Sequence, residues 1–168
     1  MRCIAETAPR PTSASAPPGS PSSQLRRFHP HDIPVISDIV RDALHENYDN
    51  SLYISLGQQW PDGFLVAADA LGRPIGFLLG VMQVDGEGRI LMFAVDRSHR
   101  GRGIGTQLMQ AFLERCRTRG LRRVTLEVRV SNATAIRFYT DFRFSVIDLL
   151  RTYYSDGEDG YQMARDVA

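Results

Sequence analysis

The glycine-rich run from Arg100 to Gly105 constrains the fold of this 168-residue chain more than any other feature. It follows the apolar segment Ile90–Val95 and leads into a helical pattern that begins at Thr106. Backbone N–H groups at a helix start point away from the helix at the positive end of its dipole, and glycine lets a phosphate approach them closely. Arg100 and Arg102 add positive charge. This strand, loop and helix therefore predict a site for a cofactor that carries a diphosphate.

Other interpretations of these glycines fit less well. A dinucleotide-binding fingerprint is expected at the start of a βαβ unit, with an acidic residue ending the second strand. Here the run comes late in the chain, after a predicted antiparallel meander. An ATP-binding loop would carry Gly-Lys followed by Ser or Thr, which this run lacks. On the glycines alone a plain tight turn is an equal alternative, and their place after a meander strand favours cofactor binding.

Apolar spacing along the chain predicts a mixed α/β domain. Strands are expected at Leu25–Phe28, Phe64–Ala68, Ile75–Val84, Arg89–Val95, Arg123–Val130, Phe144–Leu150 and Tyr161–Arg165. Helices are expected at Ile33–Leu44, at about Gly103–Arg119 and at about Asn132–Asp141. Asp32 is the predicted N-cap of the first helix, and Gly120 ends the second. The aromatic stretch Glu46–Trp60 is predicted to be irregular.

Length and composition indicate one domain in a reducing compartment. A chain of this size has room for one well-buried core. The Pro- and Ser-rich segment 1–24 predicts a disordered tail, and residues 25–168 predict the folded domain. Cys3 and Cys116 fall in the tail and in a helical stripe, which is a poor geometry for a disulfide. Without an apolar run long enough to cross a bilayer, or a signal-peptide core, we expect a soluble cytoplasmic protein with no membrane partner.

Charged residues suggest few partners. Five arginines crowd the end of the helix that follows the glycines: Arg115, Arg117, Arg119, Arg122 and Arg123. Such a cluster is most often a solvated face, and docking on nucleic acid or the ribosome is the alternative. We expect no sequence-specific nucleic-acid binding, and a monomer or weak dimer. No metal site is predicted, because His29, His31 and His99 have no Cys or His partners at metal-ligand spacing.

The run Arg100-Gly101-Arg102-Gly103-Ile104-Gly105 reads Arg-x-x-Gly-x-Gly at a strand-to-helix junction. In this it resembles the GNAT acetyltransferase superfamily, whose acetyl-CoA signature is Gln/Arg-x-x-Gly-x-Gly/Ala at that junction. The segments Leu126–Asn132, Ala135-Ile136, Phe138-Tyr139 and Tyr153–Tyr161 look like those of protein N-terminal acetyltransferases. The second half is also similar to the bacterial ribosomal-protein alanine acetyltransferase RimI.

The segments Glu46-Asn47-Tyr48 and Trp60-Pro61 resemble the substrate loop of the catalytic subunit of N-terminal acetyltransferase A and its archaeal relatives. Two positions depart from these relatives. They often have Leu-Pro where this chain has Leu44-His45, so the entry to the loop is expected to differ. They often carry His or Tyr at position 89, where this chain has Arg89.

The resemblance implies an α/β GNAT fold: a mixed central sheet of six to seven strands, flanked by about four helices. Two central parallel strands, here Arg89–Val95 and Arg123–Val130, would splay apart to admit acetyl-CoA as co-substrate. Phe93, Ala94 and Val95 would pair with its pantetheine, and a backbone N–H there would stabilise the oxyanion. The residues from Arg100 to Gly105 would hold its pyrophosphate. Asn132 and Tyr139 match further cofactor-contacting positions.

The resemblance also implies the chemistry, which is direct attack of an amine on acetyl-CoA in a ternary complex. Glu127 matches the base position of RimI-like enzymes, and Tyr139 would protonate the departing thiolate. Glu46, Tyr48, Tyr153 and Tyr154, together with Glu127, would bind the acceptor, for which the amino terminus of a protein or peptide is expected. From the strand pattern alone, an exposed Glu127 is the alternative. Without the resemblance, Tyr139 could be an ordinary, partly buried helix tyrosine with its hydroxyl satisfied. A small amine or lysine acceptor, and a non-catalytic acetyl-CoA-binding module, are the competing functions.

Overall fold

The computed structural model describes residues 23–167, and the predicted tail lies outside them except for its last two residues. The strands are β1 (Gln24–Arg27), β2 (Phe64–Ala68), β3 (Pro74–Met82), β4 (Glu87–Val95), β5 (Arg123–Arg129), β6 (Ser145–Leu150) and β7 (Gly160–Asp166). The α-helices are α1 (Ile33–Leu44), α2 (Asn50–Gln59), α3 (Ile104–Thr118) and α4 (Ala133–Asp141). Short 3-10 helices lie at η1 (Pro30–Asp32), η2 (Pro61–Gly63) and η3 (Arg97–His99). None of these helices is long and apolar enough to span a bilayer.

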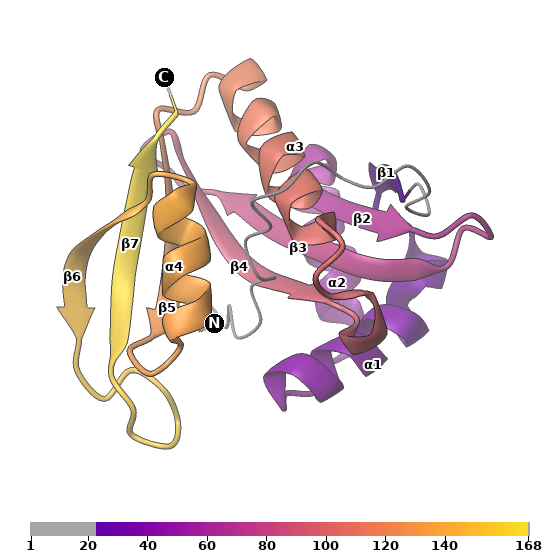
Figure 1. Cartoon of the computed structure of the whole chain (residues 1–168). Helices are drawn as coiled ribbons and strands as arrows, with labels where there is room; N and C mark the ends of the chain where they lie inside the picture. The colour runs from indigo at the N-terminus through magenta and orange to yellow at the C-terminus, as the bar shows by residue number, and fades with distance from the viewer. Residues whose placement is uncertain (1–22, 168) are drawn as a thin grey trace.

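The seven strands form one sheet in the order β1-β2-β3-β4-β5-β7-β6. Its only parallel pair among the described residues is β4 with β5. Helices α3 and α4 cover one face and α1 and α2 the other (Figure 1), and each face buries its own apolar cluster. These findings confirm the predicted α/β architecture of a mixed central sheet flanked by helices.

The parallel strands β4 and β5 diverge soon after they begin. Their ladder pairs only Glu87–Arg89 with Arg123–Thr125. On the other side of β4, Leu79 of β3 is opposite Met92 while Gly80 is opposite Ile90, so Leu91 is an extra residue. Such a bulge bends its strand and increases the local twist. The bulge accounts for the bend of β4 away from β5, and the predicted splay between these strands is confirmed.

Helix α2 corrects the prediction that the stretch Glu46–Trp60 is irregular. Asp49 caps this helix, because its side chain accepts a hydrogen bond from the Ser51 N–H at 2.8 Å. The helix buries only Tyr53 and Leu56 fully, so its apolar periodicity is weak. The capping sequence was therefore a better signal of the helix than the pattern of apolar residues.

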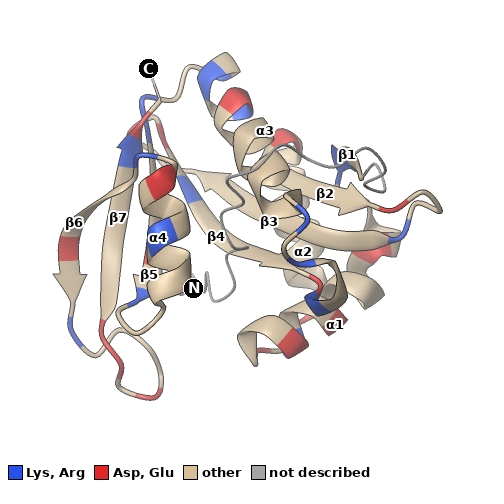
Figure 2. Cartoon of the chain, viewed as in Figure 1, with Lys and Arg blue, Asp and Glu red and all other residues tan. Residues whose placement is uncertain are grey.

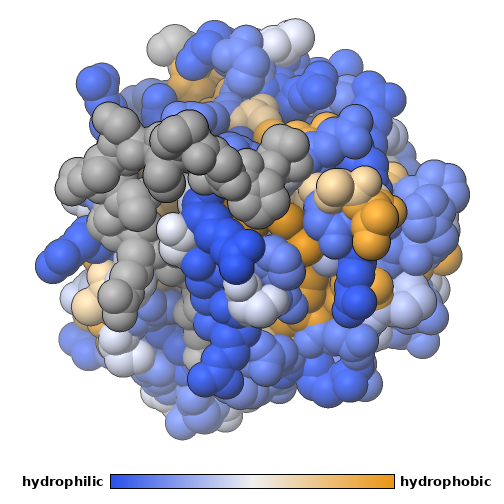
Figure 3. All heavy atoms as spheres, turned by 45° about the vertical axis from the view of Figure 1, so that its right-hand side comes forward, coloured by the Kyte–Doolittle hydropathy of each residue, from blue (hydrophilic) through white to orange (hydrophobic). Residues whose placement is uncertain are grey.

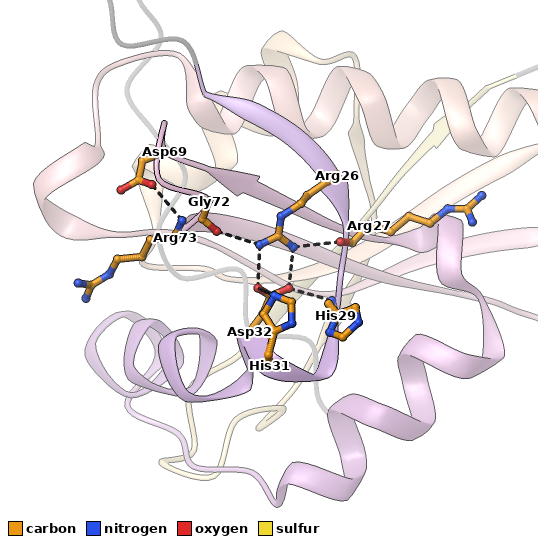
Figure 4. Close-up of polar contacts among 8 residues, drawn as sticks. All are labelled: Arg26, Arg27, His29, His31, Asp32, Asp69, Gly72 and Arg73. Carbon is orange, nitrogen blue, oxygen red and sulfur yellow. Dashed lines mark hydrogen bonds and ion pairs between the residues drawn. The ribbon is translucent and has the colours of Figure 1, made fainter.

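Asp32 occupies the predicted N-cap position of α1, but its side chain does not cap that helix. Its carboxylate instead accepts hydrogen bonds from both terminal nitrogens of Arg26, at 2.7 and 2.8 Å, and from the His29 N–H at 2.8 Å (Figure 4). Arg26 also donates to the Gly72 carbonyl oxygen at 3.1 Å. The Asp32 side chain is fully buried. This ion pair joins β1, the start of α1 and the β2–β3 turn.

Replacing Asp32 with Asn is expected to lower the free energy of unfolding by about 3 kcal/mol at pH 7, because the partly buried Arg26 loses its counter-charge. Burial alone would raise the pKa of Asp32, but the hydrogen bonds from Arg26 and His29 outweigh it and leave this pKa lowered. The stabilisation is therefore complete above the unfolded-state pKa of about 3.9 and is lost as the pH falls through the folded-state value. Denaturant unfolding at pH 7 and about pH 3 measures both effects.

The control for this prediction is Asp38→Asn, which breaks an exposed pair with Arg41 on α1. We expect it to change the free energy of unfolding by less than about 0.5 kcal/mol. Equal stability of the Asp32 and Asp38 variants at pH 7 would contradict the importance of the buried pair.

Cys116 lies on the buried stripe of α3 as predicted, whereas Cys3 falls outside the described residues. Burial raises the pKa of the Cys116 thiol to about 12. Only the thiolate attacks disulfides. A Cys3→Ser variant is therefore expected to show almost no reaction with an aromatic disulfide reagent when folded, and one reactive thiol per chain in guanidinium. Fast labelling of the folded variant would show that α3 opens readily.

Candidate active site

The loop between β4 and α3 presents backbone N–H groups to a ligand. Gly101 and Gly103 have φ values of +76° and +78°, a left-handed conformation that favours glycine. A Cβ atom added to either would meet no atom within 4 Å, so the space beside them is open. Gly103 is the N-cap of α3 and has no side chain to cover the first turn. The geometry therefore fits the predicted pyrophosphate site, with Ile104 and Gly105 buried beneath it.

The two arginines of this loop differ in their surroundings. Arg100 is half-buried, and its Nε donates a hydrogen bond to the Val95 carbonyl oxygen at 3.0 Å. Its side chain therefore ties the loop to the end of β4. Arg102 is exposed. Of the two, Arg102 is the one whose charge faces solvent.

The predicted pairing edge, Phe93 to Val95, lies beyond the point where the β4–β5 ladder stops. All three side chains are buried. Phe93 packs on Phe138 of α4, with ring centroids 5.7 Å apart, while its backbone pairs with Leu78 of β3 on the other side. β3 thus pairs with one edge of β4, and among the described residues no strand pairs with the other edge beyond Arg89.

Helix α4 carries the two predicted cofactor contacts of the second motif. Asn132 is its N-cap, and the side-chain oxygen accepts a hydrogen bond from the Ala135 N–H at 3.0 Å. Tyr139 is fully buried, and its ring lies edge-on to Phe138 and Phe144, with centroids 5.6 and 5.9 Å away. Asn132 therefore has a structural role whatever else it contacts, and aromatic neighbours fix the orientation of the Tyr139 ring.

Glu127 is buried rather than exposed, with a side chain only 3% accessible. Its Oε2 accepts hydrogen bonds from Nε and Nη2 of Arg89, at 3.1 and 3.0 Å. The same Nη2 donates to the Tyr153 hydroxyl at 3.2 Å. A glutamate is rarely buried unless it is paired, and here the pair spans β4 and β5 where they begin to diverge. The alternative of an exposed strand carboxylate is therefore wrong.

Glu127 and Tyr139 lie on opposite faces of the sheet. Leu126 and Val128 of β5 belong to the cluster under α3 and α4, and Tyr139 belongs to the same cluster. Because side chains alternate along a strand, Glu127 points to the face that α1 and α2 cover. The two predicted catalytic groups thus flank the diverging strands from different sides.

The predicted acceptor-binding tyrosines gather on the α1 and α2 face. Tyr48, Tyr153 and Tyr154 all pack in or against the apolar cluster there. Tyr48 and Glu46 are half-buried in the connection between α1 and α2, which His45 enters with a left-handed φ of 53°. The structure therefore brings the three tyrosines to one cluster and places Glu46 in the adjoining connection.

A cluster around Arg129 holds the loop between β6 and β7 against the end of β5. The Arg129 guanidinium lies 4.1 Å from the Tyr154 ring centroid and forms ion pairs with Asp156 and Glu158 at 2.8 and 2.7 Å. Glu158 also accepts a hydrogen bond from the Ser131 N–H at 3.0 Å. Hydrogen bonds from Ser131 and Arg129 lower the pKa of Glu158. This loop, which carries the acidic segments at the end of β6 in Figure 2, is held in place.

Sequence reasoning missed the roles of Arg89 and of the Arg129 cluster. Arg89 stood out only as a departure from relatives. Arg129 shares the Glu127 face by strand alternation, and an acidic loop follows β6. Those two signals together could have indicated the ion pairs. Among residues 23–167 no three His, Cys, Asp or Glu side chains gather as potential metal ligands.

Comparisons with known proteins agree with this geometry. The model of the acetyltransferase (GNAT) family matches residues 33–144. The N-terminal acetyltransferase A complex catalytic subunit NAA10 of Arabidopsis thaliana is 36% identical over 150 residues, which cover 85% of this chain and 77% of that protein. The crystal structure of Ard1 from Thermoplasma volcanium is 40% identical, with a TM-score of 0.83 over 87% of this chain and 98% of that one.

A more distant likeness concerns the fold alone. The crystal structure of the ribosomal-protein-S18-alanine N-acetyltransferase from Escherichia coli is 24% identical, with a TM-score of 0.76 over 88% of this chain and 95% of that one. A glycine loop at a strand-to-helix junction, a splay between parallel strands, a matching family model and relatives of this identity all agree. The chain belongs to the acetyltransferase (GNAT) family and uses acetyl-CoA as its acetyl donor.

Proposed function

We propose that this chain transfers the acetyl group of acetyl-CoA to the N-terminal α-amine of proteins or peptides, by direct attack in a ternary complex. The observation that carries this proposal is the buried Glu127 carboxylate where β4 and β5 diverge, with the hydroxyl of Tyr153 beside its partner Arg89. The names of the Arabidopsis and Thermoplasma relatives support it.

The proposed reaction requires only a moderate base. An α-amine has a pKa of about 7.7 to 8.0 and a lysine side chain about 10.4, so a useful fraction of amino termini is neutral at pH 7. The neutral nitrogen attacks the thioester carbonyl carbon, and Glu127 takes the second proton, directly or through a water. A backbone N–H of the Phe93–Val95 edge donates to the oxyanion. The C–S bond then breaks, and Tyr139 protonates the thiolate.

The acceptor peptide would lie over the face that α1 and α2 cover. The half-buried Tyr48 and Tyr153 supply aromatic surface there, and Glu46 and Glu127 supply carboxylates. Tyr154 is buried and packs edge-on against Tyr153. Such a set suits a few residues of extended peptide, because aromatic side chains give contact area and the carboxylates attract an amine. It is larger than a small amine needs.

Paired peptides test this proposal. Each pair has one sequence with an internal lysine, and its members differ only in a free or a blocked amino terminus. Release of the thiol of CoA is expected with the free member and not with the blocked one. Activity on the blocked, lysine-containing peptides alone would overturn the proposal, and binding of acetyl-CoA without turnover on any amine would indicate a non-catalytic module.

The contacts of the five arginines near the end of α3 give little support to ribosome docking. Arg115, Arg117 and Arg123 form ion pairs with nearby carboxylates, and Arg122 donates to the Asp85 carbonyl oxygen at 2.9 Å. Three of the five guanidiniums are therefore paired with carboxylates, which favours the solvated face. Co-sedimentation with ribosomes at low and high salt decides between the two, because phosphate contacts weaken as salt rises.

We also propose a monomer or weak dimer in the cytoplasm, and the described surface bears on the oligomeric state. The face drawn in Figure 3 is mostly hydrophilic, with apolar atoms showing between the polar ones. The large apolar side chains exposed among residues 23–167 are Leu71, Val84, Val146, Ile147 and Leu149. Two of them lie in turns, and the other three lie on the edge strand β6. Sedimentation velocity over a range of protein concentrations tests the oligomeric state.

A further inference from the structure

We propose that Arg89 is a positioning residue, which holds the Glu127 carboxylate by one oxygen and leaves the other to the acceptor amine. This inference rests on the proposed function and deepens it at the same site. It concerns one of the two positions at which the sequence analysis found a departure from relatives.

The shape of the ion pair is the first observation. A guanidinium and a carboxylate often meet with two parallel hydrogen bonds that occupy both oxygens. Here Nε and Nη2 of Arg89 both donate to Oε2 of Glu127. Among the described residues, no hydrogen bond to Oε1 accompanies them. The carboxylate is thus fixed and charge-balanced through Oε2, and Oε1 keeps its capacity to accept from an amine or a water.

The place of Arg89 in the sheet is the second observation. Arg89 and Thr125 form the last rung of the β4–β5 ladder, and Glu127 is two residues further along β5. Beyond this rung no backbone ladder keeps the two strands at a fixed separation. The Arg89 side chain therefore joins β4 to β5 at the mouth of the splay, where Glu127 would otherwise depend on β5 alone.

A third contact extends the connection to the acceptor side. Nη2 of Arg89 also donates to the hydroxyl of Tyr153, in the loop between β6 and β7. The Arg89 guanidinium therefore connects Glu127, the proposed base, to β4 and to Tyr153 of the predicted acceptor site. A shift of about 1 Å in a catalytic group can cost about 10²-fold in rate, so this fixed relation matters for turnover.

The fourth observation is that the other groups beside Glu127 do not pair with its carboxylate as Arg89 does. Thr125 and Arg129 flank Glu127 on β5, and Gln162 of β7 is opposite it. Arg129 is engaged by two carboxylates of the β6–β7 loop. Removal of the Arg89 charge would therefore leave the buried Glu127 carboxylate without its counter-charge.

The test compares Arg89→Gln, Glu127→Gln and the double variant in the peptide assay, with Arg41→Gln on the surface of α1 as the matched control. Arg89→Gln is expected to lower kcat by about 10- to 100-fold and to leave KM for acetyl-CoA unchanged. In the Glu127→Gln background the Arg89 substitution is expected to cost nothing further. Arg41→Gln is expected to match the wild type.

Arg89→Lys serves if the Gln variant fails to fold. It keeps the positive charge but not the paired donors, so it is also expected to lower kcat. Unchanged kcat in the Arg89 variants, or losses that multiply in the double variant, would overturn this inference while the proposed function stands. A wild type that is inactive on every free amino terminus would overturn the proposed function and this inference together.

Discussion

Replacing Glu127 with glutamine is expected to lower kcat by about 10²- to 10³-fold, within the range for loss of a positioned general base. Glutamine has nearly the same shape and can still accept from Arg89, so the ladder between β4 and β5 and the buried packing are retained. The amide cannot take the proton of the attacking amine. Steady-state kinetics with a free-amine peptide at saturating acetyl-CoA measure the loss.

Two controls separate chemistry from structure in this variant. KM for acetyl-CoA is expected to stay within about two-fold, because Glu127 faces the side of the sheet that we propose for the acceptor rather than for the donor. Glu114→Gln, on the exposed surface of α3, is expected to keep wild-type turnover. Full turnover by the Glu127 variant would show that the acceptor loses its proton without this carboxylate.

Replacing Gly103 with valine is expected to raise KM for acetyl-CoA by about 10- to 100-fold, the equivalent of losing one or two hydrogen bonds to a charged group. The added Cβ meets no protein atom within 4 Å, so its bulk enters the space from which a phosphate reaches the first turn of α3. A β-branched residue also opposes the φ of +78° at this position. Initial rates over a range of acetyl-CoA concentrations measure the change.

The matched control for this substitution is Gly120→Val. Gly120 has the same φ of +78° and open space beside it, but it lies at the opposite end of α3. The two variants carry a similar backbone strain, so they are expected to lose similar stability while only the Gly103 variant loses affinity for acetyl-CoA. An equal rise of KM in both variants would mean that strain in α3, rather than access to its first turn, limits binding.

Local patterns predicted most of the fold. The run from Arg100 to Gly105 combines a strand end, left-handed glycines and a helix start within a few residues, so neighbours in the sequence determine it. Helix α2 was not predicted because Tyr53 and Leu56 are its only buried residues, which is too few for a clear helical pattern of apolar residues. Asp32 sits at the predicted helix start, but its partner Arg26 lies on β1, and no local rule selects that partner over the helix N–H groups.

The site was less predictable because it depends on pairing between distant segments. Strand alternation places Glu127 on a polar face, and nothing in that pattern indicates that the face is buried. The parallel register sets Arg89 opposite Thr125, two residues before Glu127 on β5. This register brings Glu127 to a partner that lies 38 positions earlier in the sequence. Resemblance to relatives pointed to Glu127, but it did not point to Arg89 as the partner of that carboxylate.

The position of the acetyl group on a single peptide tests the central claim most directly. The peptide carries one free α-amine and one internal lysine, and it is incubated with acetyl-CoA and the full-length chain. Fragmentation by mass spectrometry then locates the added acetyl group on one nitrogen or the other. The proposed function predicts acetylation at the α-amine, dependent on Glu127. Acetylation at the lysine with an unmodified amino terminus would contradict it.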